Sequence, residues 1–127
     1  MVMNSKKKIG LGTWAWGNKL FWEYKQNSDI ELRDTFQEAI KRGFSIIDTA
    51  DSYGTGKLSG RSEKLLGNFL SEIPKSQKRN IQIATKLAPY PWRIGKKGFN
   101  KPFLNSLERL QNKLDIVQLH WSTAKYN

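Results

Sequence analysis

Four residues of the chain have the types and spacing to form one centre for proton transfer, and three of them stand in equivalent places. Asp48, Lys86 and His120 each end a short apolar segment, at intervals of 38 and 34 residues, and Tyr53 follows Asp48 in a glycine-bearing loop. A carboxylate at the end of a buried strand is costly to desolvate unless another charge pairs with it. A phenol, an ammonium, an imidazole and a carboxylate brought together would form a centre for general acid–base chemistry.

The apolar segments that end on these residues are predicted to be strands. They cover residues 44–48, 81–87 and 114–120, and residues 9–13 form a further short strand with two glycines near its end. Side chains alternate between the two faces of a strand. If these strands are parallel neighbours, Asp48, Lys86 and His120 converge at one rim of the sheet, and Tyr53 lies in the loop just above it.

Amphipathic helices are predicted between the strands. Ser28 and Glu31 have the spacing of a capping box, and they begin a helix of about 14 residues that stops at a glycine. A second helix presents a leucine-rich stripe within residues 65–70, and Ser62 and Glu63 in its first turn suit the helix dipole as capping residues.

A third helix is predicted to begin at Asn100, with Pro102 in its first turn. A helix then occupies each gap between successive strands, which indicates repeated strand–helix–strand units with parallel strands and right-handed crossovers. This repeat alone is compatible with an open doubly wound sheet and with a closed barrel.

Five motifs stand in one order over nearly the whole chain. They are Gly10-Leu-Gly-Thr-Trp14, Asp48-Thr-Ala-Asp-Ser-Tyr53-Gly54, Ser62-Glu-Lys-Leu-Leu-Gly67, Ala84-Thr-Lys86 and Gln118-Leu-His120-Trp121. In order and spacing they resemble the aldo-keto reductase family, which implies an α/β fold of the (β/α)₈ TIM-barrel type. Such a barrel needs about 250 residues. We therefore expect residues 1–127 to be the N-terminal half of one NADP-dependent oxidoreductase domain, with about four parallel strands and three helices, truncated after the fourth strand.

The resemblance also implies a reaction, the NADPH-dependent reduction of an aldehyde or ketone to an alcohol by hydride transfer. Tyr53 would be the proton donor to the carbonyl oxygen, and Lys86 would stabilise the phenolate that remains. Asp48 would hold Lys86 in place, and His120 would donate a hydrogen bond that orients the carbonyl group.

The binding residues follow from the same resemblance. Gly12, Thr13, Trp14 and Asp48 would lie at the nicotinamide end of NADP, whereas the phosphates would bind mostly to loops of the second half of the barrel. Aromatic residues of three loops would line the pocket for a small carbonyl substrate. For the first loop, residues 14–24, an equally favoured interpretation is that its aromatic side chains pack on one another and line no pocket. These residues are Trp16, Trp22, Tyr90, Trp92 and Trp121.

Composition excludes several other functions. The net charge of +11 comes from lysines and arginines that are dispersed apart from two short clusters at residues 6–8 and 96–97, so we expect no nucleic-acid partner. No apolar run reaches the roughly 20 residues that span a bilayer, and no apolar signal core follows the basic start, so we expect a cytoplasmic protein without a membrane partner. The chain has no cysteine, and we expect no metal site.

Two expectations concern what half a barrel does. Its first and fourth strands would have unpaired edges, which allow self-association. The alternative to an enzyme is a non-catalytic binding or regulatory module, or an inactive fragment, similar to the aldo-keto-reductase-like β subunits of potassium channels.

Overall fold

The computed structural model describes residues 9–122, which form an α/β structure around one parallel sheet. The strands are β1 (Gly10–Gly12), β2 (Ile46–Asp48), β3 (Gln82–Leu87) and β4 (Ile116–Leu119), and they lie in the order β1-β2-β3-β4. Each neighbouring pair is parallel. The predicted fold class, with four parallel strands in sequence order, is confirmed.

The register places the carboxyl ends of β1 and β2 side by side, next to the middle of β3 and the start of β4. Gly12 pairs with Asp48, Asp48 with Ala84, and Ala84 with Ile116. Lys86 lies two residues beyond Ala84 on β3, so it points to the same face of the sheet as Asp48. Asp48 and Lys86 therefore project from one face of the sheet near the carboxyl ends of β2 and β3.

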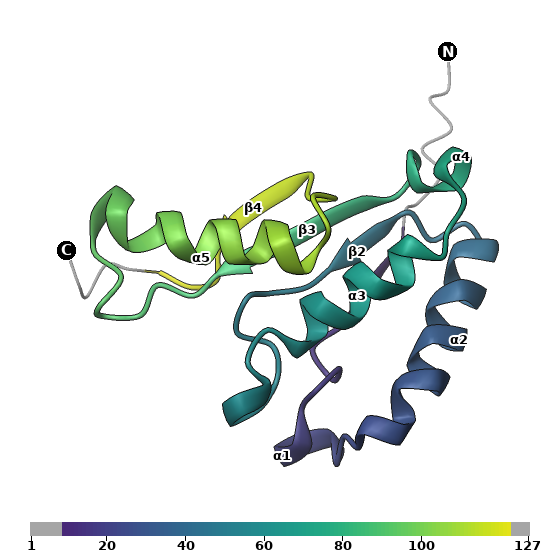
Figure 1. Ribbon diagram of the computed structural model, residues 1–127, viewed down its shortest axis with the longest axis horizontal. Coiled ribbons are helices and arrows are strands. Elements are labelled where there is room, and N and C mark those ends of the chain that lie inside the picture. Colours follow the sequence, from purple (N-terminus) through teal and green to yellow (C-terminus); the bar gives the residue numbers. More distant parts are fainter. Residues whose placement is uncertain (1–8, 123–127) are drawn as a thin grey trace.

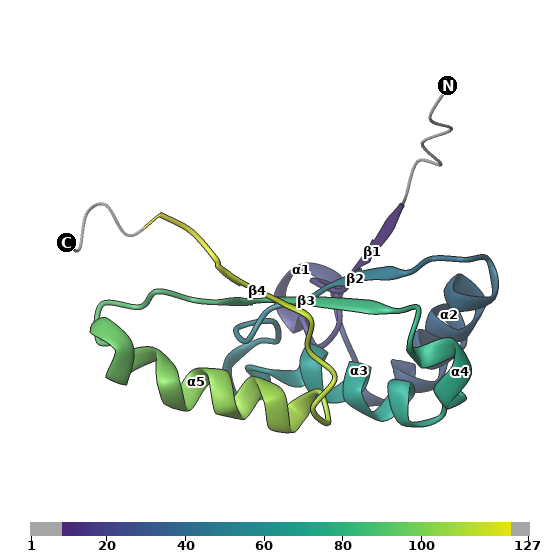
Figure 2. The ribbon, with the colours of Figure 1, turned by 90° about the horizontal axis from the view of Figure 1, so that it is seen from above.

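Three long helices cover one face of the sheet: α2 (Asp29–Lys41), α3 (Arg61–Ser71) and α5 (Gly95–Arg109). Figures 1 and 2 show all three on the same side, with β1 to β4 above them in Figure 2. Between the two layers lies an apolar core. Its fully buried members include Phe36, Ile47, Leu66, Leu70, Ile81, Ile83 and Leu110. Each large aliphatic or aromatic side chain buried there stabilises the fold by about 1.5–3 kcal/mol.

The starts of all three long helices differ from the sequence prediction. Ser28 does not cap α2 with its side chain, because residues Gln26–Ser28 form a 3₁₀ turn that leaves Ser28 in helical geometry. Gly60, with φ of +81°, stands before α3. Ser62 and Glu63 are fully buried and bond to other elements, so their predicted capping role is wrong.

The third long helix begins five residues before the expected Asn100, so Pro102 lies inside α5 and not in its first turn. The first turn closes when Gly98 donates to the carbonyl of Ile94 at 3.1 Å. A Cβ at Gly98 would lie 2.5 Å from the carbonyl carbon of Arg93, so this turn packs against the preceding loop only because residue 98 has no side chain.

Shorter elements complete the described part of the chain. They are α1 (Lys19–Trp22), α4 (Lys75–Lys78) and the 3₁₀ turns η1 (Gln26–Ser28) and η2 (Gly56–Leu58). The outer strands of the sheet are β1 and β4, as the half-barrel prediction requires. Three large apolar residues of β4 are exposed: Ile116, Val117 and Leu119.

Among residues 9–122, no helix has the length and apolar character that crossing a membrane requires. Within the same range, no three side chains of histidine, cysteine, aspartate or glutamate are grouped to hold a metal ion. The basic cluster at residues 6–8 lies outside the described residues.

Candidate active site

Lys86 is the centre of the rim at the carboxyl ends of β2 and β3. Its ammonium group donates to Asp48 Oδ2 at 2.7 Å, to the carbonyl oxygen of Thr49 at 3.0 Å and to the Tyr53 hydroxyl at 3.3 Å. An ammonium group has three hydrogens, and these three contacts use all of them. Lys86 is therefore held in one orientation, with its positive charge beside the phenol oxygen of Tyr53.

His120 approaches the same phenol from the end of β4. Its backbone N–H donates to the carbonyl oxygen of Leu87 at 3.1 Å, which extends the pairing of β3 and β4 by one step. The imidazole stands nearly edge-on to the ring of Tyr53, with the centroids 5.5 Å apart. Its Nδ1 lies 3.1 Å from the hydroxyl oxygen of Ser52.

The surroundings of His120 keep its imidazole neutral. Burial lowers the pKa of His120 below its usual value of 6.5, and the charge of Lys86 lowers it further. Asp51 and Asp48 act in the opposite direction and do not reverse the shift. Near neutral pH the ring thus carries one N–H, and it can serve as a hydrogen-bond donor without being a cation.

The structure thus brings together the four residues expected to be catalytic: Asp48, Tyr53, Lys86 and His120. A carbonyl oxygen beside Tyr53 could accept a proton from the phenol and a hydrogen bond from the imidazole. The arrangement places a phenol beside a lysine ammonium group and an imidazole, which are groups able to take part in general acid–base chemistry.

Of the three other residues expected near the nicotinamide, Gly12 and Trp14 are exposed to solvent and Thr13 is buried. Gly12 is exposed, and a Cβ there would meet no atom within 4 Å. Trp14 is 50% exposed. Thr13 is fully buried, donates its hydroxyl to the carbonyl of Asp48 at 3.0 Å and accepts from Ser62 at 2.7 Å. The Thr13 side chain therefore supports the rim from below and does not face a ligand above it.

Three of the aromatic residues expected in the substrate pocket lie together beside His120. The rings of Tyr90 and Trp92 are stacked with centroids 4.7 Å apart, and Trp121 contacts Tyr90 edge-on at 5.8 Å. Trp121 also lies against the imidazole of His120, at 5.0 Å. The loop after β3 and the residue after His120 thus form one aromatic wall, which meets His120 through Trp121.

The aromatic residues after β1 divide into two groups. Trp22 packs edge-on against Trp14 at 4.5 Å, and both rings are about half exposed. Trp16 is buried in the core and packs against Phe69 of α3 at 5.7 Å. The chain turns after Thr13, where the N–H of Trp16 bonds back to the Thr13 carbonyl, and this turn carries Trp16 beneath the rim. Trp16 is therefore a core residue, contrary to its assignment to the pocket.

Asp51 and Arg93 belong to the rim, although the sequence analysis did not select them. The carboxylate of Asp51 is almost fully buried, accepts from the backbone N–H of Ala88 at 3.1 Å and forms an ion pair with Arg93. The same guanidinium bonds to the Ala88 carbonyl at 2.8 Å and lies over the Tyr90 ring at 4.9 Å. Asp51 thus ties the loop that carries Tyr53 to the aromatic wall. The sequence feature that could have identified Asp51 is its place within the Asp48–Gly54 motif.

A second ion pair supports β3 from the helix side. Glu63 is fully buried and accepts from the hydroxyl of Thr85 and, at 2.7 Å, from Nε of Arg109. Thr85 precedes Lys86 on β3 and points to the opposite face of the sheet. The charge of Glu63, which suggested a helix cap from sequence alone, instead joins α3, β3 and α5.

A profile of the aldo/keto reductase family matches residues 8–127, which is nearly the whole chain. The chain belongs to this family. Over 125 residues it is 48% identical to the chloroplastic pyridoxal reductase of Arabidopsis thaliana, and the match covers 96% of this chain and 34% of that protein. The chain spans about a third of the length of the curated relatives it matches. Because this relative is named as chloroplastic, the cytoplasmic location expected from the sequence stays a prediction.

Solved structures of aldo-keto reductases have the same fold. A thermostable aldo-keto reductase in complex with the inhibitor epalrestat superposes with a TM-score of 0.73 at 26% identity, over 98% of this chain and 43% of that one. An aldo/keto reductase from Klebsiella pneumoniae, in complex with NADP and acetate, gives 0.70 at 28% identity, over 88% and 34%. The sheet and helices described here are thus part of an aldo-keto reductase TIM barrel.

The rim fits one end of a nicotinamide cofactor. The open backbone of Gly12 and the exposed ring of Trp14 offer an unobstructed surface next to the candidate catalytic residues. The two basic side chains described at this rim, Lys86 and Arg93, are both paired with aspartates. With both cations paired, this rim suits the nicotinamide ring, which is uncharged in NADPH, better than the phosphates.

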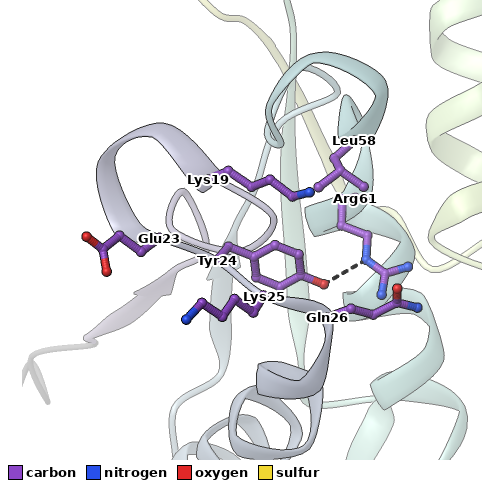
Figure 3. Close-up of a pocket in the computed structure, with 7 residues that line it drawn as sticks. All are labelled: Lys19, Glu23, Tyr24, Lys25, Gln26, Leu58 and Arg61. Carbon is purple, nitrogen blue, oxygen red and sulfur yellow. Dashed lines mark hydrogen bonds between the residues drawn. The ribbon is translucent and has the colours of Figure 1, made fainter.

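A separate hollow of about 760 Å³ lies in the described part of the chain beside α1 and the start of α3 (Figure 3). Arg61 donates to the Tyr24 hydroxyl at 3.0 Å within it, and also pairs with Asp29. Its lining residues are Lys19, Glu23, Tyr24, Lys25, Gln26, Leu58 and Arg61. None of the four candidate catalytic residues lines this hollow, so it is separate from the rim.

Proposed function

We propose that this chain is the catalytic half of an NADPH-dependent reductase that converts an aldehyde or ketone into an alcohol. The observation that carries the proposal is the position of the Lys86 ammonium, 2.7 Å from Asp48 and 3.3 Å from the Tyr53 hydroxyl. The family to which the chain belongs supports it.

Each residue of the rim has a defined part in this reaction. NADPH, when bound, supplies the hydride. Tyr53 gives its phenolic proton to the carbonyl oxygen, and the charge of Lys86 stabilises the phenolate that remains. Asp48 offsets the cost of keeping Lys86 charged at a partly buried site. His120 donates a hydrogen bond to the same oxygen and holds it within reach of Tyr53.

The wall formed by Tyr90, Trp92 and Trp121 favours an aromatic aldehyde as the substrate. Trp121 lies against His120, and Tyr90 and Trp92 continue the wall outwards, where the group attached to the carbonyl carbon would be placed. The relative at 48% identity is named for pyridoxal, which is itself an aromatic aldehyde. NADP in the Klebsiella relative supports the choice of NADPH as the hydride donor.

A completed barrel provides the test. The 127-residue chain is joined to the part of the Arabidopsis pyridoxal reductase that follows the aligned region, called the plant half, and this fusion is called the completed barrel below. We expect it to oxidise NADPH in step with the conversion of pyridoxal to its alcohol. Lys86→Met is the matched variant, and the plant half alone is the control. Equal rates in the fusion and in its Lys86→Met variant would contradict the proposal.

A further inference from the structure

Ser52 lies between the two functional residues Asp51 and Tyr53, and its side chain faces the imidazole of His120. The Ser52 hydroxyl oxygen is 3.1 Å from His120 Nδ1. The backbone bond from His120 to Leu87 holds its main chain, and the rings of Tyr53 and Trp121 pack against the imidazole. Of the two ring nitrogens, Nδ1 is therefore engaged by Ser52, and Nε2 is the one left to meet a substrate.

The direction of the bond between Ser52 and His120 decides what the ring can do. A hydroxyl group can donate or accept, and a neutral imidazole carries one hydrogen, on either nitrogen. If Ser52 donates to Nδ1, the ring hydrogen is on Nε2. If Ser52 accepts, the hydrogen is on Nδ1 and Nε2 becomes an acceptor. A carbonyl oxygen only accepts hydrogen bonds, so only the first arrangement lets His120 bind it.

We propose that Ser52 is a positioning residue: it donates its hydroxyl hydrogen to Nδ1 of His120 and thereby keeps the ring hydrogen on Nε2, for donation to the substrate carbonyl. The partner of one ring nitrogen commonly sets the tautomer of a functional histidine. That Ser52 is the partner of Nδ1 rests on the contact alone. The direction of the bond, and the use of the Nε2 hydrogen in reduction, rest on the proposed function.

The tautomer can be measured directly in the 127-residue chain, because His120 is its only histidine. In nitrogen-15-labelled protein at about pH 8, where the ring is neutral, we expect resonances of a hydrogen on Nε2 and an acceptor at Nδ1. Ser52→Ala should shift the ring towards a mixture of both tautomers, and Ser52→Thr should retain the wild-type pattern. Ser71→Ala is the control, because that hydroxyl bonds to the Asn68 carbonyl in α3.

Two results of this measurement would overturn the assignment. One is a wild-type chain with the ring hydrogen on Nδ1, which would make Ser52 the acceptor. The other is a Ser52→Ala chain with the same tautomer populations as wild type, which would make Ser52 irrelevant to them. Neither result depends on catalytic activity.

Kinetics of the completed barrel test the second step. We expect Ser52→Ala to lower kcat for pyridoxal by about tenfold, which is the lower end of the loss seen when a metal-binding histidine loses the partner that orients it. KM for NADPH should be unchanged, and Ser52→Thr should restore kcat. A Ser52→Ala rate equal to wild type would overturn the catalytic use of the tautomer. A wild-type fusion without reductase activity would instead contradict the proposed function and leave the nitrogen spectra to decide the role of Ser52.

Discussion

The ammonium group of Lys86 lies 2.7 Å from the carboxylate of Asp48 and joins the ends of two neighbouring strands. The register makes this contact possible, because Asp48 pairs with Ala84 and Lys86 follows on the same face of β3. The same ammonium bonds to the Tyr53 hydroxyl and to the Thr49 carbonyl, so one cation orders the loop after β2. We expect the chemistry of the rim to depend on this arrangement.

Tyr53→Phe should abolish reduction in the completed barrel and leave the affinity for NADPH nearly unchanged. The substitution removes the proton donor and keeps the ring that contacts His120. General acid catalysis contributes about 10²–10⁴-fold, so turnover should fall by a factor in that range. Steady-state assays with pyridoxal and a fluorescence titration with NADPH measure the two quantities. Turnover within about threefold of wild type would exclude Tyr53 as the general acid.

The single imidazole should titrate below its usual range, and Lys86 should be part of the cause. Burial and the charge of Lys86 lower the pKa of His120. In Lys86→Met the positive charge is gone, so the pKa of His120 should rise towards 6.5 without reaching it if burial remains the larger cause. Proton NMR of the 127-residue chain reports this titration without overlap from other histidines. A pKa that is identical in the two chains would show that the charge of Lys86 does not act on the ring.

The lowered pKa of His120 also predicts a loss of stability in acid. The unfolded chain gains a proton on this residue near its usual pKa of 6.5, before the folded chain does. The contribution of His120 to the free energy of unfolding is therefore fully present above about pH 6.5 and is lost as the pH falls towards the folded-state pKa. Urea midpoints at about pH 7.5 and about pH 5 should differ less in His120→Gln than in wild type. An equal difference in the two chains would contradict the linkage.

The strands and the four-residue rim could be predicted because both depend on local sequence. Asp48, Lys86 and His120 each end an apolar strand, and parallel pairing brings such ends together whatever the loops do. The positions of Thr13 and Trp16 could not be predicted in this way. Both depend on a turn after β1 that carries Trp16 into the core, and nothing in the spacing of the aromatic residues shows which ring is turned inwards.

Buried ion pairs were missed for a related reason. Glu63 and Ser62 stand where charged and hydroxyl residues commonly cap a helix, and only the packing of α3 against β3 and α5 shows that they face inwards. In the sequence, Asp51 is likewise only one of several polar residues in its loop. Its pairing with Arg93, 42 positions later, appears only in the structure. Partners this far apart in the sequence are specified by the tertiary fold.

Arg109→Met should strongly destabilise the chain. It leaves the fully buried carboxylate of Glu63 without its cation, and breaking such a pair costs about 3–5 kcal/mol. Arg42→Met is the matched control, since Arg42 pairs with Glu38 at an exposed site and such pairs contribute about 0–1 kcal/mol. Chemical denaturation gives both free energies of unfolding. Similar losses in the two variants would show that Glu63 does not need Arg109.

The 127-residue chain alone should show no NADPH-dependent carbonyl reduction, although it carries all four candidate catalytic residues. Holding the reacting groups in near-attack geometry can supply roughly 7–11 kcal/mol of the barrier. That geometry needs a cofactor anchored by its phosphates, and phosphate sites in barrels of this type usually follow strands seven and eight. In addition, Ile116 is 42% exposed on the strand that leads to His120. Water that reaches this face weakens the electrostatic effect of Lys86 on Tyr53.

A titration of the purified chain decides this last prediction. NADPH binding is followed by fluorescence while a reactive aromatic aldehyde is assayed, and size-exclusion chromatography gives the oligomeric state of the active fraction. We expect weak binding and no turnover from a monomer. Tight binding with turnover by a monomer would place the whole cofactor site within these residues. It would show that loops after strands seven and eight are not needed to anchor the phosphates. Turnover found only in the dimer fraction would mean that the open edges of β1 and β4 in two copies close one barrel. That activity should be lost on dilution, as the dimer dissociates.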